Sequence, residues 1–252
     1  KILSLSTACS GGSCVLSAAK YDFQTNVWQN WQNGNWATPT NLVYANLSIP
    51  KLPFIGGASS TNYPTVTALP GTQDFLITYA GKNGATGAKS IRSALYRGLS
   101  DDWALWNNGW QTNFLIGSQE IVPETQIDPQ NRQTYVQGDK VYMIYKKNDN
   151  SGSNWPLYLL SYNMSSPSWS SEQQIISGID SFAIKKDPSG IVWMIYSNAN
   201  DLMMVSISNG VLSTPNKIYD LNSNTQPIGL DFAGSEPVVF IREYQYPQNI
   251  IY

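Results

Sequence analysis

The chain has 252 residues, a length that suits one or two ordinary domains or a single large all-β domain. Charged residues make up only 13% of it and the formal net charge is −2, which speaks against the basic face that a nucleic-acid partner needs. Histidine is absent, so neither a zinc site nor a Ser-His-Asp triad is expected.

A strand that follows a glycine turn and usually ends in tyrosine recurs along the chain. Its residues are apolar almost without interruption, which is typical of a strand buried on both faces. In the last copy Arg242 takes the position of the tyrosine. In chain order the copies run from Gly12 to Ala18, Gly71 to Tyr79, Gly138 to Tyr145, Gly190 to Tyr196 and Gly234 to Arg242.

A second strand, which starts at a tryptophan, follows each of the first four copies. The repeated tryptophans are Trp36, Trp110 and Trp169, and Leu212 takes their position in the fourth copy. Because these residues recur in register, we expect them to pack between repeats. The strands cover Asn35–Leu42, Gly109–Ile116, Ser168–Ile175 and Val211–Ile218.

With one further apolar stretch before and one between these features, each repeat has four short antiparallel strands in about 45–65 residues. This unit predicts an all-β fold, a single β-propeller domain with about five blades of four strands. A two-sheet sandwich is the alternative, but it does not require the features to recur in register. The blades would span about 1–50, 51–120, 121–178, 179–221 and 222–252.

The last blade is short, because no tryptophan-started strand follows its glycine turn. Either the N-terminal segment Lys1–Leu5 completes this blade and closes the ring, or the chain is cut from a longer protein. Closure would remove an exposed strand edge, which is otherwise a template for aggregation.

Two features predict a secreted protein, the cysteine pair and the glycosylation sequons. Cys9 and Cys14 flank a Gly-rich spacer that could close a small disulfide loop in an oxidising compartment. The alternative, half of a metal site, lacks partner ligands. Asn46 and Asn163 begin glycosylation sequons. No stretch of about 18 apolar residues suggests a membrane span.

The blade pattern resembles the sialidase-like and lectin-like β-propellers. The segment Ser161–Trp169 is similar to a degraded Asp-box, the turn motif SxDxGxTW, with Asn163 for Asp, Ser165 for Gly and the tryptophan one residue late. The composition, rich in Ser, Asn, Tyr and Trp and poor in charge, is also similar to extracellular glycoproteins and virion proteins of thermoacidophilic archaea. The likeness implies an extracellular or virion-surface location.

Catalysis is one hypothesis that the resemblance raises. A sialidase needs three arginines and a tyrosine nucleophile paired with an acid, and Arg242 is expected near a central channel, but the Arg-Ile-Pro signature is absent. A glycosidase would use carboxylates in the funnel, with Asp128, Asp180 and Glu243 as candidates. Asp128–Pro129 resembles the Asp-Pro entry of five-bladed glycosidases, yet an Asp beside Pro is usually a turn residue. No cofactor-binding motif is present.

Glycan binding is the hypothesis that the composition favours, because sugar rings stack on aromatic rings and their hydroxyls need polar partners. Tryptophans that break the repeat are the candidates, since in a strand Trp28 and Trp31 point to opposite faces, as do Trp103 and Trp106. The predicted ligand-binding residues are Trp28, Trp31, Trp103, Trp106, Trp155 and Arg242.

Three functions therefore remain open. The chain would bind glycans or glycoproteins on a cell surface and mediate attachment, or hydrolyse glycosides, or serve as a structural surface or filament module without a small-molecule ligand. Self-association or attachment to a larger assembly is compatible with each.

Overall fold

The computed structural model describes residues 2–10, 13–32, 35–37, 64–82, 89–111, 120–148, 155–221, 225–245 and 248–251. Every regular element in these ranges is a β-strand, and the neighbouring strands pair antiparallel. None of the described segments is a helix that is long and apolar enough to cross a membrane. The all-β prediction and the repeated antiparallel unit of a β-propeller are confirmed.

The chain forms two compact units. The first contains Lys1–Pro129 with Ser166–Ser168, and the second contains Gln130–Ser165 with Trp169–Tyr252. Strand β10 (Glu120–Gln137) begins in the first unit, where it pairs with β7, and ends in the second, beside β11. Assignment of the whole chain to one propeller domain stays a prediction.

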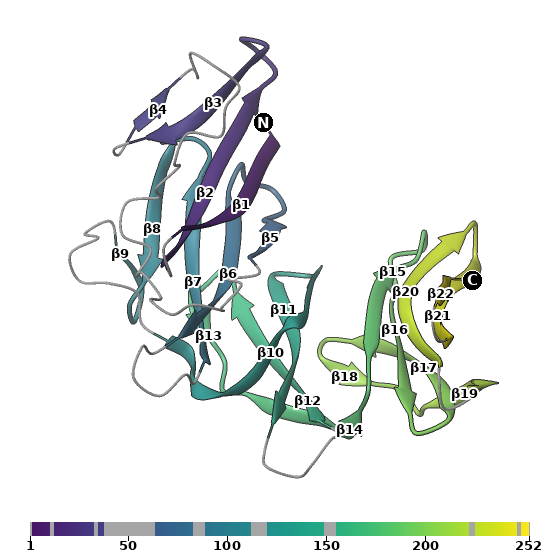
Figure 1. The fold of residues 1–252 in the computed structure, drawn as a ribbon. Coiled ribbons are helices and arrows are strands. Elements are labelled where there is room, and N and C mark those ends of the chain that lie inside the picture. Colours follow the sequence, from purple (N-terminus) through teal and green to yellow (C-terminus); the bar gives the residue numbers. More distant parts are fainter. Residues whose placement is uncertain are drawn as a thin grey trace. The chain divides into compact units, whose positions relative to one another are not determined.

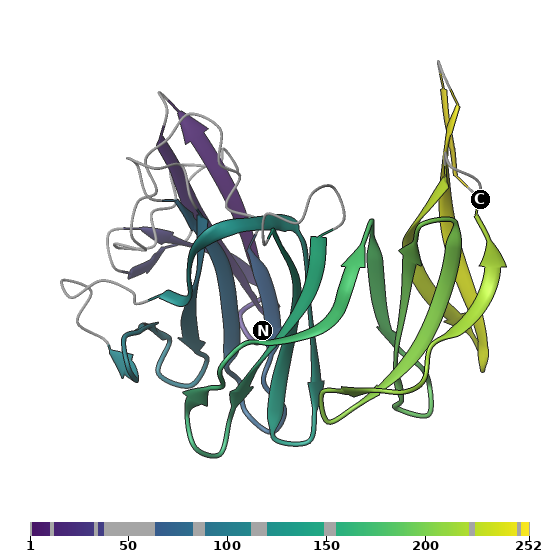
Figure 2. The same ribbon diagram turned by 90° about the horizontal axis from the view of Figure 1, so that it is seen from below.

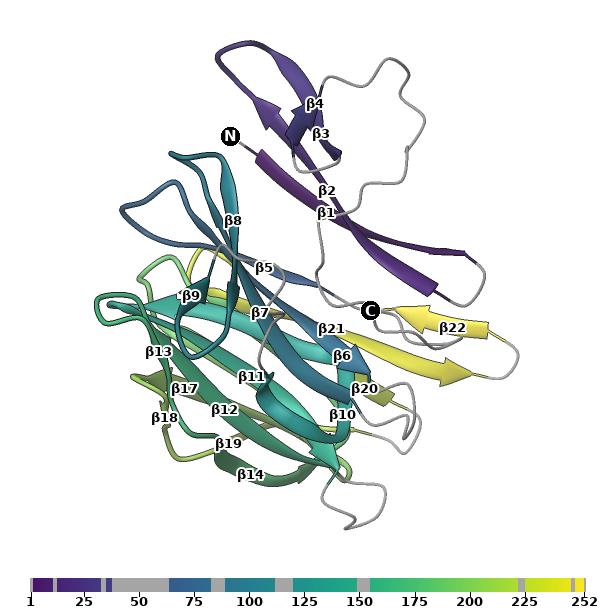
Figure 3. The same ribbon diagram turned by 90° about the vertical axis from the view of Figure 1, so that its left-hand side faces the viewer.

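The first unit holds the strands of blades 1 and 2. In blade 1 the strands lie in chain order and β1 forms a long hairpin with β2 (Figure 3). Ile2–Leu5 pairs with Ala18–Tyr21 in this hairpin, and closure of the last blade by the same strand stays a prediction. Blade 1 contains β1 (Ile2–Ser10), β2 (Ser13–Asp22), β3 (Val27–Gln32) and β4 (Asn35–Ala37). Blade 2 contains β5 (Thr65–Ala68), β6 (Phe75–Lys82), β7 (Lys89–Arg97), β8 (Asp102–Trp106) and β9 (Trp110–Gln111).

Blades 3, 4 and 5 follow, and their strands are drawn in teal, green and yellow (Figures 1 and 2). Blade 3 contains β10, β11 (Lys140–Asn148), β12 (Trp155–Asn163), β13 (Ser168–Trp169) and β14 (Gln173–Ile179). Blade 4 contains β15 (Phe182–Lys186), β16 (Val192–Asn198), β17 (Asp201–Ser208), β18 (Val211–Leu212) and β19 (Asn216–Asp220). Blade 5 contains β20 (Thr225–Ala233), β21 (Glu236–Gln245) and β22 (Gln248–Ile251).

The strand after each glycine turn is the centre of the core in the second unit. In β16, Met194 packs into a cluster with residues of blade 3, while its neighbour Ile195 packs into a second cluster with residues of blade 5. Neither side chain is accessible to solvent. The predicted burial of this strand on both faces is confirmed in blade 4. Each such side chain stabilises the fold by roughly 1.5–3 kcal/mol relative to exposure.

The outer strand of blades 3 and 4 is broken at a serine. Ser170 follows β13, where its Oγ accepts a hydrogen bond from Ser161 N (3.0 Å) and its own N–H donates to Ser161 O (2.8 Å). Ser213 follows β18 and makes the same two bonds with Ser206, at 3.0 and 2.9 Å. In both blades the hydroxyl satisfies a backbone donor that would otherwise lack a partner at the break. The outer strand then resumes three residues later.

Candidate functional site

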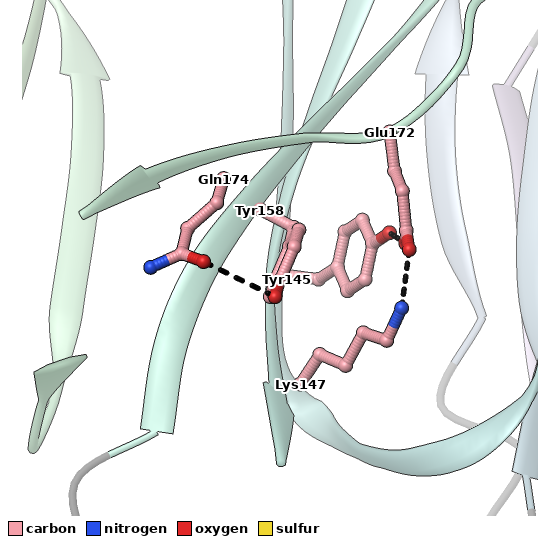
Figure 4. Close-up of polar contacts among 5 residues, drawn as sticks. All are labelled: Tyr145, Lys147, Tyr158, Glu172 and Gln174. Carbon is pink, nitrogen blue, oxygen red and sulfur yellow. Dashed lines mark hydrogen bonds and ion pairs between the residues drawn. The ribbon is translucent and has the colours of Figure 1, made fainter. Parts of the chain in front are cut away.

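A carboxylate lies at the break in the outer strand of blade 3. Glu172 immediately precedes β14, and its two oxygens accept hydrogen bonds from Tyr145 and Lys147 of β11 (Figure 4). The Tyr145 Oη to Glu172 Oε2 distance is 2.6 Å, and Lys147 Nζ contacts Oε1 in an ion pair. Tyr145 and Lys147 are two residues apart, so the pleat of β11 places them on one face.

Two further residues extend this layer across β12 and β14. Tyr158 lies opposite Tyr145 in the β11–β12 pairing, and their stacked rings have centroids 6.1 Å apart. Tyr158 Oη donates to Gln174 Oε1 at 3.3 Å. Lys147 Nζ lies 5.0 Å from the centroid of the Tyr158 ring, which is a cation–π contact. We call Tyr145, Lys147, Tyr158, Glu172 and Gln174 the blade-3 cluster (Figure 4).

The blade-3 cluster extends from the core to solvent. The Tyr145 side chain is completely buried, whereas 17% of Lys147 and 29% of Glu172 is accessible, and Gln174 is exposed. Burial raises the pKa of Tyr145 well above its usual value, and its hydrogen bond to Glu172 raises that pKa further. The phenol therefore stays protonated and holds the carboxylate as a donor.

The strand pairings of blades 3 and 4 identify the residues of blade 4 that are equivalent to the blade-3 cluster. Tyr145 pairs with Tyr158 and Tyr158 with Gln174, while Tyr196 pairs with Met203 and Met203 with Lys217. Lys147 and Asn198 each lie two residues after the tyrosine, and Glu172 and Pro215 each lie two residues after the serine at the break, so these residues are also equivalent. The blade-4 counterparts of Tyr145, Lys147, Tyr158, Glu172 and Gln174 are Tyr196, Asn198, Met203, Pro215 and Lys217.

This comparison separates scaffold from site. The tyrosine and the serine break are present in both blades, so they belong to the architecture. The carboxylate, the ammonium group and the second ring occur in blade 3 and are replaced in blade 4. A blade of this type therefore forms without them, and in blade 4 Lys217 pairs instead with Asp201 and Asp220.

The prediction that Trp103 and Trp106 are exposed platforms for a ligand is wrong. Trp103 and Trp106 are buried, with 1% and 8% of their surface accessible. Trp103 packs on Tyr96 at 5.1 Å, and Trp106 meets Trp110 edge to face at the same centroid distance. Side chains on both faces of β8 are covered, so alternation along the strand does not bring either ring to the surface.

The other aromatic and cationic candidates occupy varied environments. Trp28 is exposed, at 41% of its surface, and Trp155 is half-buried with Lys146 Nζ 5.9 Å from its ring centroid. Arg242 is half-buried in β21, opposite Ile251 of β22. The backbone of Trp31 pairs with that of Trp36, and its side chain lies outside the described residues. Their binding roles stay predictions.

The candidate catalytic carboxylates are not brought together by any described contact. Asp180 is exposed, and its backbone oxygen accepts a hydrogen bond from Lys146 Nζ at 2.5 Å. The side chains of Asp128 and Glu243 lie outside the described residues. A catalytic role for the three stays a hypothesis.

The modification sites are described in part. Cys9 and Cys14 lie directly opposite each other in the β1–β2 hairpin, and their side chains lie outside the described residues, so the disulfide stays a prediction. Asn163 Oδ1 accepts the Ser165 N–H at 3.0 Å in the turn that resembles an Asp-box. Asn46 lies outside the described residues, and glycosylation at either sequon stays a prediction.

Comparison with known proteins identifies no family. No family model matches the chain, and no curated protein matches it. Among solved structures, a bifunctional GH43-CE protein of Bacteroides eggerthii is similar with a TM-score of 0.43 and 10% identity, over 77% of this chain and 26% of that one. An exo-β-1,3-galactanase from Clostridium thermocellum is similar with a TM-score of 0.44 and 14% identity, over 95% of this chain and 54% of that one. The chain thus spans 26% and 54% of the lengths of these two proteins.

Proposed function

We propose that this chain binds glycans and that the blade-3 cluster is a contact site for a sugar ring. A sugar presents hydroxyl groups that need donors and acceptors, together with C–H faces that pack on aromatic rings. The blade-3 cluster offers a carboxylate, an ammonium group, an amide and the ring of Tyr158 within one layer of three adjacent strands. A few convergent polar groups beside an aromatic surface are typical of small-molecule sites.

The observation that carries the proposal is the fixed Glu172 carboxylate. A carboxylate has about four acceptor positions, and the contacts of Glu172 with Tyr145 and Lys147 use two of them. Both partners come from one strand, so the carboxylate is held in place before any ligand arrives. Adjacent sugar hydroxyls could then donate to the remaining positions without the carboxylate having to reorganise.

Binding accounts for the blade-3 cluster better than hydrolysis does. Glycosidases normally use a pair of carboxyl groups that flank the bond to be broken, and this cluster contains one. Tyr145 is a poor nucleophile because burial and Glu172 both keep its phenol protonated. An extracellular or virion-surface location, attachment to a host or cell surface, and glycoprotein partners belong to the same proposal, supported by the cysteine pair and the sequons.

Replacement of Glu172 tests the proposal directly. Binding to the neutral polysaccharides galactan, xylan and mannan is measured by affinity gel electrophoresis, and Kd for oligosaccharides of the best ligand by calorimetry. For Glu172→Gln we expect a loss of roughly 10- to 100-fold in affinity, because a hydrogen bond to a charged group contributes about 1.5–3 kcal/mol.

Lys217→Gln is the matched control, because it removes a charge at the register equivalent of Gln174 in blade 4 and should leave binding unchanged. Wild-type affinity in a folded Glu172→Gln variant, or no binding of the wild-type chain to any of the three polysaccharides, would contradict the proposal. Release of reducing sugar from the bound polysaccharide would show that the chain hydrolyses glycans, and would overturn the proposal that it only binds them.

A further inference from the structure

Three aromatic rings gather on the hairpin of β2 and β3 in the first unit. Tyr21 lies opposite Trp28 in the pairing, with ring centroids 5.3 Å apart at 50°. Phe23 follows on the same face, 5.2 Å from Tyr21 at 90°. Phe23 and Trp28 are 63% and 41% accessible to solvent. We call Tyr21, Phe23 and Trp28 the hairpin aromatics.

The opposite face of this hairpin is anchored in the first unit. Lys20, next to Tyr21 on the other face of β2, is 2% accessible and pairs with the Asp101 carboxylate. The hydroxyl of Tyr96 donates to the same carboxylate. Asp101 has a φ of 60°, a left-handed conformation that Asp adopts more readily than most residues. The buried face of β2 therefore fixes the hairpin and leaves the hairpin aromatics on its outer side.

The turn itself is also held. Asn26 has a φ of 57° and its side-chain oxygen accepts a hydrogen bond from the Tyr21 hydroxyl. Asp22 Oδ1 accepts from the N–H of Gln24 at 2.9 Å. These contacts restrict the two strand ends and the ring of Tyr21. A ligand that binds here would lose little affinity to the ordering of the protein.

The cross-strand contact of Tyr21 and Trp28 stabilises the hairpin, but it does not require the rings of Phe23 and Trp28 to be exposed to solvent. Clusters of exposed apolar side chains mark interaction sites. The side chains around the turn are uncharged apart from Asp22, and the one lysine of the hairpin is turned into the core. An anionic membrane surface would require exposed basic residues. Neutral rings at two angles, beside the amides of Gln24 and Asn26, are complementary to a neutral sugar with an apolar C–H face.

We propose that the hairpin aromatics form a second glycan-binding site, separate from the blade-3 cluster. The inference rests on the proposed function for its ligand class, but it depends on different residues. Two sites on one chain would bind a polysaccharide with several repeats more tightly than a short oligosaccharide, because the second contact becomes intramolecular.

The experiment uses the full chain, xylan, galactan and mannan as polysaccharides, and short oligosaccharides of whichever is bound best. We expect Phe23→Ala and Trp28→Ala each to weaken polysaccharide binding at least fivefold, and the conservative variant Trp28→Phe to restore most of it. Tyr219→Ala is the matched control, since Tyr219 is also an exposed aromatic, at 59%, and lies on β19. Circular dichroism and the thermal midpoint establish that each variant is folded.

The two proposals fail separately. If Glu172→Gln loses affinity while folded Phe23→Ala and Trp28→Ala bind as wild type, the second site is wrong and the first stands. If only the hairpin variants lose affinity, the blade-3 cluster is wrong and the hairpin stands. Binding of phosphatidylcholine vesicles that Trp28→Ala abolishes, with unchanged polysaccharide binding, would assign the hairpin to lipid and overturn this inference.

Discussion

Blades 3 and 4 have the same scaffold but present different side chains on it. Both have a buried strand that contains a tyrosine at the same register, and both have an outer strand broken at a serine with the same pair of hydrogen bonds. After the break blade 3 places Glu172, whereas blade 4 places Pro215. The comparison teaches that the repeat determines the strands and that the residues just past the break determine which side chains the blade presents.

The largest expected effect tests whether the two scaffolds are equivalent. Ile144 and Ile195 occupy the same register in β11 and β16, and neither is accessible to solvent. We expect Ile144→Ala and Ile195→Ala each to lower the free energy of unfolding by about 2–5 kcal/mol, because each leaves a cavity in a packed core. Urea unfolding followed by tryptophan fluorescence measures this. A loss below about 1 kcal/mol in one blade alone would break the equivalence.

A smaller effect should distinguish the two tyrosines. Tyr145→Phe removes the hydroxyl that donates to Glu172, and we expect a loss of about 1–2 kcal/mol in unfolding free energy. The pKa of Tyr196 is raised by burial alone, so Tyr196→Phe should change stability by about 0.5 kcal/mol or less. Equal losses of unfolding free energy in the two variants would show that the hydrogen bond to Glu172 does not stabilise blade 3.

The smallest effect concerns acid stability, and it belongs to the turn of blade 4. The pKa of Asp187 is lowered, first by the hydrogen bond from Ser189 and also by those from Trp193 Nε1 and from the N–H groups of Ile191 and Ser189. A pKa that is lower in the folded state gives stability that is present above the unfolded value of about 3.9. That stability is lost as the pH falls through the folded value.

Thermal midpoints between pH 6 and pH 2 measure this contribution. We expect the difference in midpoint between the wild-type chain and Asp187→Asn to shrink as the pH falls below about 4, since protonation removes the same carboxylate. A difference that stays constant over this range would show that the charge of Asp187 does not stabilise the turn.

The fold could be predicted because the same pattern recurs. A glycine turn followed by an apolar strand is a local signal, and each copy confirms the others. The prediction of exposed tryptophans in blade 2 was wrong, because the alternation of side chains along a strand was not enough to predict exposure. Alternation separates the faces of a strand but does not say whether both are covered, and β8 is covered on both.

The blade-3 cluster was not predicted, because none of its members is unusual by itself. Tyr145 belongs to the repeat, and Lys147 is one of a basic pair. Glu172 follows a predicted strand start at Trp169, where a continuous strand was expected. It meets Tyr145 and Lys147 only because the outer strand breaks at Ser170 and because register shifts follow between β12 and β14. An aligned comparison of blades 3 and 4 would have marked Glu172 and Pro215 among the positions that differ.

The serine break also makes the blade modular. Ser170 and Ser213 bond to the backbone of Ser161 and Ser206, and the position two residues later lies outside the strand ladder. That position holds Glu172 in blade 3 and Pro215 in blade 4, so its side chain can change while the break is kept. Blade 4 therefore offers a scaffold of known register for the same side chains. Grafting Lys, Tyr, Glu and Gln onto positions 198, 203, 215 and 217, beside the existing Tyr196, would reproduce the blade-3 cluster in blade 4. Under the proposed function, the graft would add one more sugar-contact site to the chain.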